Sequence, residues 1–116
     1  MSIQILQHEF LGPVRLSEWG PPMEKVVYVV LARDKDRFHL VYADVCEHTD
    51  DMSFFVSNGS FKCWMERAGS EENLYLAILP MFASDPLRRR FVLDRIIDST
   101  KPPCNGVNQG GSRTPL

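Results

Sequence analysis

Long apolar runs are absent from this 116-residue sequence, and neither sign of charge is in large excess. Nowhere do about 18 apolar residues stand together, which is the length that a membrane-spanning helix needs. The chain also begins without a basic leader and apolar run, so we expect a cytoplasmic protein with no membrane partner. A formal net charge of -2 gives no global attraction to nucleic acid. Any site for a polyanion must therefore be local.

Cysteine is scarce, and its three positions are widely and unequally spaced. Cys46, Cys63 and Cys104 are an odd number, and their spacing is not that of a disulfide framework, so we expect reduced thiols. Together with His48 they are the residue types that bind zinc. There is no C-x-x-C pair, however, and a Cys-x-His pair on a strand rarely chelates one ion. We therefore expect no metal site.

The composition that is present, 44% apolar and 24% charged, is typical of a globular domain. The length fits one domain, since single cores of roughly 100–150 residues are the commonest size. Residues 1–24 hold short apolar runs broken by glycine and proline, which predicts an extended arm packed on the domain. Residues 106–116 are polar and without periodicity, which predicts a disordered tail. The domain itself then covers residues 25–105.

The segment "EKVVYVVLARDKDRFHLVYADVC" carries the strongest strand signal. Two apolar, β-branched and aromatic runs flank a charged turn at Asp34–Arg37, a pattern that predicts a hairpin. The first run, Val26 to Ala32, is apolar on both faces, so we expect an interior strand.

Four further segments have the pattern of regular elements. Two short helices, each ending at a glycine, are predicted over 49–59 and 60–69, and a buried strand is predicted over 73–81. A last helix is predicted after Asp85, which is a good N-cap, with Pro86 at its first position. The order β-β-α-α-β-α predicts an α+β sandwich, in which helices flank a three-stranded, mostly antiparallel sheet.

This order, with a tyrosine on each hairpin strand and a last helix that leads into Pro-Pro-x-Asn, resembles the GIY-YIG nuclease family. "VVY" at 26–28 stands at the first family motif and "VYAD" at 41–44 stands at the second. "LDRIIDSTKPPCN" at 93–105 is the most specific match. The resemblance covers residues 25–105.

The resemblance implies that Tyr28, Tyr42 and Asn105 line one shallow groove. The two prolines before Asn105 impose an extended exit from the helix, which would bring the asparagine back towards the tyrosines. Two other interpretations stay open. The tyrosines could be ordinary strand residues, and Asn105 could be a loop residue that bonds to backbone.

The catalytic residues of the family do not have counterparts here. The resemblance places the metal-binding glutamate at Leu93, which cannot ligate a cation. Asp94 is one residue further along, which turns its side chain by about 100° away from the groove. The family arginine is expected on the first helix, where Asp50 and Asp51 stand instead. We therefore expect binding rather than catalysis and no cofactor, with Mg²⁺ or Mn²⁺ needed only if the domain is an active nuclease.

Basic residues supply the candidate contacts to nucleic acid. The run of arginines at 88–90 is usually a solvated face, but Arg89 lies one turn before Leu93 and so leans towards the inferred groove. Trp64 is a candidate surface for stacking bases. The candidate phosphate contacts are Arg89, Arg90, Lys62, Arg67 and Lys101.

Three functional hypotheses follow. The first is a catalytically degenerate GIY-YIG-like domain that serves as a binding or scaffold module, with nucleic acid as its candidate ligand. The second is an active metal-dependent endonuclease in which Asp94 or Asp44 replaces the missing glutamate. The third is a plain protein-interaction domain. The net charge favours the first and the third.

Overall fold

The computed structural model describes residues 2–18, 23–49, 58–81 and 85–105. The strands are β1 (Ser2–Ile5), β2 (His8–Arg15), β3 (Met23–Asp34), β4 (Arg37–Thr49) and β5 (Leu74–Pro80). The helices are α2 (Phe61–Ala68) and α3 (Pro86–Thr100), with 3-10 turns η1 (Leu16–Glu18) and η2 (Glu71–Asn73). The predicted tail at 106–116 lies outside the described residues, as does nearly all of the helix predicted over 49–59.

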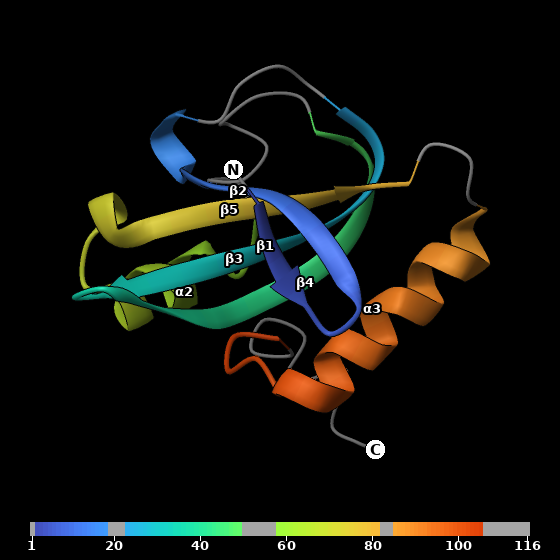
Figure 1. Cartoon of the computed structure of the whole chain (residues 1–116). Coiled ribbons are helices and arrows are strands. Elements are labelled where there is room, and N and C mark those ends of the chain that lie inside the picture. The colour runs from blue at the N-terminus through green and yellow to red at the C-terminus, as the bar shows by residue number, and fades with distance from the viewer. Residues whose placement is uncertain (1, 19–22, 50–57, 82–84, 106–116) are drawn as a thin grey trace.

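The strands form one antiparallel sheet of five strands in the order β1-β2-β5-β3-β4 (Figure 1). The expectation of a three-stranded sheet was therefore wrong, although the α+β class is right. The two additional strands come from the segment that we expected to be an extended arm, because β1 and β2 pair as a hairpin and β2 then pairs with β5.

A glycine and a proline inside β2 explain why this strand was missed. The pairing of β2 with β5 shifts between Leu11 and Val14, so the irregularity falls on Gly12 and Pro13. Such a bulge accommodates residues that a regular strand excludes. Gly12 has a φ of +107°, and a Cβ there would lie 2.8 Å from the carbonyl oxygen of Leu76. Only glycine fits this close approach of two strands.

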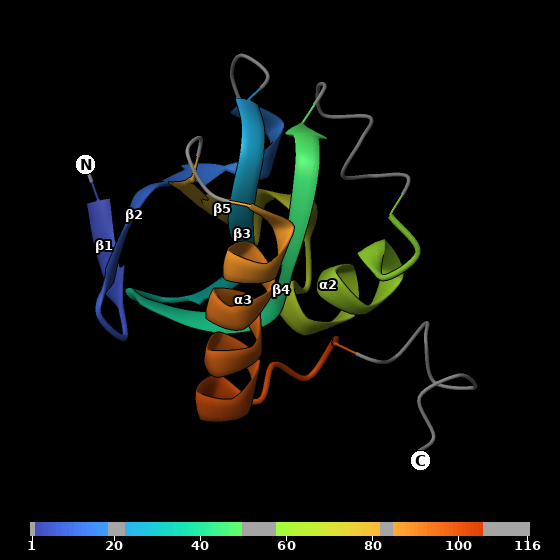
Figure 2. The same cartoon turned by 90° about the vertical axis from the view of Figure 1, so that its right-hand side faces the viewer.

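The sheet is covered on both faces, by α2 on one and by α3 on the other (Figure 2). The α2-side core contains Leu16, Val26, Tyr28, Val30, Ala32, Val41, Tyr42, Cys63, Trp64, Leu74, Leu76, Ile78 and Cys104. The α3-side core contains Phe10, Val27, Val29, Leu31, Ala43, Ala77, Val92, Leu93 and Ile96. Alternate residues of β3 enter the two cores, so β3 is buried on both sides from Val26 to Ala32, as its apolar run predicted.

The start of α3 and the end of α2 lie where the sequence predicted them. Asp85 caps α3, since its Oδ1 accepts a hydrogen bond of 2.8 Å from the backbone N–H of Arg88. Gly69 ends α2 with a φ of 85°, and Lys101 ends α3 with a φ of 49°.

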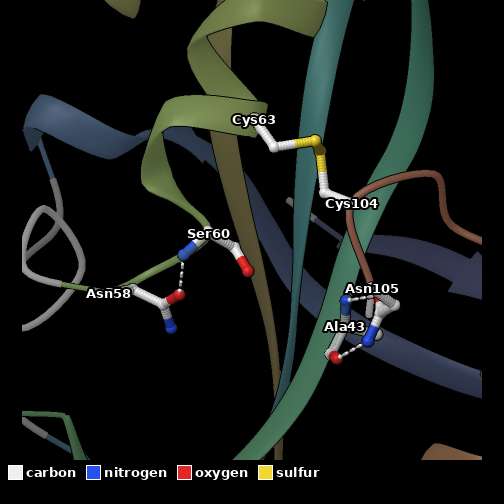
Figure 3. The surroundings of a disulfide bond; sticks show 6 residues. All are labelled: Ala43, Asn58, Ser60, Cys63, Cys104 and Asn105. Carbon is white, nitrogen blue, oxygen red and sulfur yellow. Dashed lines mark hydrogen bonds between the residues drawn. A yellow bond between two sulfur atoms is a disulfide. The ribbon is translucent and has the colours of Figure 1, made fainter. Parts of the chain in front are cut away.

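A disulfide bond joins Cys63 in α2 to Cys104 in the segment after α3 (Figure 3). The expectation of reduced thiols was therefore wrong for these two residues, while Cys46 lies outside this disulfide. The two partners are 41 residues apart in sequence, but their Cα atoms lie 5.7 Å apart. Sequence spacing gave no sign of this pairing, because it depends on where the segment after α3 crosses the sheet edge. The bond also removes two of the four ligands considered for zinc.

Candidate functional site

Tyr28 and Tyr42 belong to the α2-side core and are only 1% and 3% exposed. Their ring centroids lie 6.2 Å apart. Asn58 Nδ2 donates a hydrogen bond of 3.4 Å to the Tyr28 hydroxyl, and the Tyr42 hydroxyl donates one of 3.0 Å to Asp44 Oδ2. Burial raises the pKa of both phenols, that of Tyr42 to about 12. Both tyrosines are therefore neutral, hydrogen-bonded core residues and do not line an open groove.

Asn105 holds the segment after α3 against the edge of the sheet (Figure 3). Its Oδ1 accepts a hydrogen bond of 2.9 Å from the backbone N–H of Ala43, and its Nδ2 donates one of 2.8 Å to the carbonyl of Ala43. The N–H of Cys104 adds a bond of 2.8 Å to the carbonyl of Val41. One amide side chain thus satisfies both backbone groups of an edge residue, as a neighbouring strand would. Its described contacts fit a loop residue that bonds to backbone.

Leu93 lies in the α3-side core and is 2% exposed. It therefore lies on the opposite face of the sheet from Tyr28 and Tyr42, and the structure does not bring these three residues together. The two acids considered as replacements for a catalytic glutamate are also apart. Asp94 is exposed and pairs with Arg90 at 3.5 Å, whereas Asp44 bonds to Tyr42. Across the described residues, no group of three or more His, Cys, Asp or Glu side chains could hold a metal ion.

The predicted phosphate contacts lie in different surroundings. Arg89 is buried and forms an ion pair with Glu47 at 2.5 Å, so its guanidinium is not offered to a ligand. Arg90 is exposed on α3, Lys62 is exposed on α2, and Lys101 is exposed at the C-cap of α3. Trp64 is fully buried and cannot stack on a base. Of the five predicted contacts, only Arg67 lines the groove described next.

A groove of about 940 Å³ lies where the β3–β4 hairpin, the end of α2 and the segment after α3 meet. The hairpin turn is at Lys35 and Asp36, within the turn that the sequence predicted at Asp34–Arg37. The volume is within the range of roughly 300–1,000 Å³ that is usual for ligand sites. Its lining residues are Ala32, Arg33, Asp34, Lys35, Phe38, His39, Leu40, Val41, Arg67, Ala68, Asn73, Thr100 and Pro103.

The groove is cationic although the chain is not. Arg33, Lys35 and Arg67 give three positive charges against one carboxylate, Asp34, so the formal charge is 3 - 1 = +2 with His39 neutral. The whole chain has a net charge of -2. The two ion pairs among the described residues both involve an arginine of α3, Arg89 or Arg90, so neither neutralises a cation of the groove.

Arg33 is held in place at the rim of the groove. Its Nε donates a hydrogen bond of 2.7 Å to the carbonyl of Lys35, and one Nη donates a bond of 3.2 Å to the hydroxyl of Tyr75. Hydrogen bonds from Arg15 and then Arg33 lower the pKa of Tyr75. The ring of Tyr75 in turn makes an edge-to-face contact with Phe38, with centroids 5.0 Å apart. The rim thus joins a positioned guanidinium to an aromatic pair.

Sequence reasoning treated 34–37 only as a hairpin turn, and so it missed Arg33, Lys35 and His39 as site residues. The charged stretch "RDKDRFH" was the one available signal. It could not show that the end of α2, with Arg67, lies beside the turn. No family model matches this chain, and neither does any curated protein or any solved structure.

Proposed function

We propose that this chain is a binding module and that its groove takes the phosphate backbone of a nucleic acid. The observation that carries the proposal is the formal charge of +2 on the lining of a groove in a chain whose net charge is -2. The proposal keeps the first functional hypothesis, a degenerate GIY-YIG-like binding domain. Of the five predicted phosphate contacts it keeps Arg67, and it replaces the other four by Arg33 and Lys35.

The physical basis is local attraction between the groove cations and phosphate. Surface charges separated by more than about 8 Å are largely screened at physiological salt, so the acids elsewhere on the chain act weakly on a ligand in the groove. Arginine also forms bidentate hydrogen bonds with phosphate oxygens. Arg67 and Lys35 are exposed and are therefore the contacts available to a ligand. Asn73 and Thr100 add polar atoms to the lining.

Binding is tested by titrating the protein into a short fluorescein-labelled oligonucleotide and following its anisotropy at several salt concentrations. Each phosphate contact releases counterions, so affinity should fall as salt rises. Arg67→Glu should weaken binding by at least about tenfold, because it replaces an attraction with a repulsion. Arg88→Glu is the matched control, since Arg88 is exposed on α3 and does not line the groove.

Four results would overturn the proposal, and the last of them is complete absence of binding. The first is an affinity that does not change with salt, and the second is an equal loss in Arg67→Glu and Arg88→Glu. Either would show that the groove cations do not hold the ligand. The third is metal-dependent nicking of a supercoiled plasmid in Mg²⁺ or Mn²⁺, with a chelator control, which would replace a binding module with a nuclease. Complete absence of binding would leave a protein-interaction domain.

A further inference from the structure

The groove is lined from both faces of the β3–β4 hairpin. Arg33 and Phe38 are cross-strand partners, and so are Ala32 and His39. Neighbours along a strand point to opposite faces, so Phe38 and His39 lie on opposite sides of the hairpin. Ala32 belongs to the α2-side core, which places His39 on the same side as α2 and Arg67. Because all five residues line one groove, the groove bends around the hairpin.

A bent groove discriminates between the two forms of nucleic acid. Duplex DNA is stiff, with a persistence length of about 150 base pairs, and bending it sharply costs several kcal/mol. A single strand has free torsions along its backbone and can follow a cationic groove around a corner. Proteins that bind single strands combine such a groove with aromatic side chains on which bases stack.

Phe38 supplies that aromatic surface. It is 41% exposed and lines the groove, although it is a large apolar residue. Its ring contact with Tyr75 is edge-to-face at an interplanar angle of 78°. Arg33 bonds to the hydroxyl of that same Tyr75, so a cation and an exposed ring stand together at the rim. We infer that the groove prefers single-stranded nucleic acid and that Phe38 stacks on one of its bases, an inference that rests on the proposed function.

The test uses anisotropy competition against a labelled oligothymidylate, with four unlabelled competitors: the single strand, a duplex of the same length, a mononucleotide and inorganic polyphosphate. The single strand should compete at a concentration at least about tenfold below that of the duplex. Phe38→Ala should weaken binding of the single strand between about fivefold and about a hundredfold, the range expected for one lost stack. The affinity of Phe38→Ala for polyphosphate should equal that of the unmodified protein, because polyphosphate has no base to stack on the ring.

Two further variants make the result specific. Phe38→Tyr keeps an aromatic face and should retain binding of the single strand. Phe91→Ala removes another exposed phenylalanine, on α3 and outside the groove, and should change nothing. Melting curves of all variants confirm that each is folded.

The inference and the proposed function fail in different ways. Equal competition by duplex and single strand would overturn the inference alone. The inference alone would also be overturned if Phe38→Ala lost as much affinity for polyphosphate as for the oligonucleotide. Competition by the mononucleotide at the same concentration as the single strand would show a nucleotide pocket instead of a strand-binding groove. Failure of every polyanion to bind would overturn both.

Discussion

The two helices that cover the sheet are held in place by different means. α3 has 15 residues and is capped by the side chain of Asp85, whereas α2 has 8 residues and, within the described part of the chain, the side chain of its N-cap, Ser60, makes no capping hydrogen bond. Helices shorter than about 12 residues are marginal on their own. α2 instead carries one half of the Cys63–Cys104 disulfide and buries Trp64 completely.

The cores beneath the two helices also differ, in the kinds of side chain that fill them. The α3-side core is mainly aliphatic, with Val92, Leu93 and Ile96 contributed by the helix. The α2-side core also contains three buried aromatic side chains, Tyr28, Tyr42 and Trp64, and Trp64 packs against Tyr42 at a centroid distance of 5.1 Å. A short helix thus relies on one large side chain and a covalent bond, while a long helix relies on repeated burial and a cap. Each experiment below perturbs one side of this comparison.

Leu93→Glu should have the largest effect, because it buries a charge without a partner in an aliphatic core. We expect a loss of more than about 4 kcal/mol in the free energy of unfolding. Mn²⁺ should not raise the melting temperature of the variant, since the tyrosines of the inferred site face the other core. Leu87→Glu is the control on the same helix, where the side chain is 81% exposed. Stabilisation by Mn²⁺ would restore the GIY-YIG alignment.

Trp64→Ala should cost about 3–5 kcal/mol, measured by urea denaturation, because it empties the centre of the α2-side core. Trp64→Phe should cost much less. Within the described part of the chain the buried Nε1 of Trp64 has no hydrogen-bond partner, so its removal offsets part of the lost packing. If phenylalanine cost as much as alanine, the indole N–H would have a partner that contributes to stability.

Replacing both Cys63 and Cys104 by serine should cost about 2–4 kcal/mol, because the closed loop of some 41 residues no longer restricts the unfolded chain. A reductant should destabilise the unmodified protein by a similar amount and should not affect the double variant. Cys46→Ser is the control, because Cys46 lies outside the disulfide. A double variant as stable as the parent would show that α2 does not need the bond.

Stability should also fall in alkali, through the α2-side core. Unfolded tyrosines ionise near pH 10, whereas the pKa of Tyr42 is raised to about 12. The folded state therefore keeps a proton that the unfolded state loses, so this contribution is present below pH 10 and disappears as pH rises towards 12. The loss for Tyr42 should be at most about 1 kcal/mol over the first pH unit. Denaturation of Tyr42→Phe should show a shallower dependence on pH in this window.

Asp85→Ala should have the smallest effect, about 1 kcal/mol, because it removes one capping hydrogen bond from α3. Asp98→Ala makes the same substitution near the other end of the helix. It should be neutral or slightly stabilising, since a carboxylate there opposes the helix dipole. Equal losses at the two ends would show that capping is not what matters at Asp85.

The sequence predicted those parts of the fold that depend on local patterns. The β3–β4 hairpin, β5, α2 and α3 were predicted near their observed bounds, because periodicity, Asp85 and Gly69 are local signals. β1 and β2 were missed, because Gly12 and Pro13 break the strand pattern and only the approach of β5 explains them. The disulfide and the groove were missed for a related reason. Arg33 and Arg67 line one groove only when α2 packs beside the hairpin, which no local pattern encodes.

The disulfide has a consequence for the connectivity of the chain. Cys63 and Cys104 close a covalent ring that contains part of α2, all of β5 and all of α3. β5 is the strand between β2 and β3, so one side of the ring runs through the middle of the sheet. A protease that cuts once inside this ring leaves two fragments still joined. The cut protein should migrate as one species on a denaturing gel and as two only after reduction.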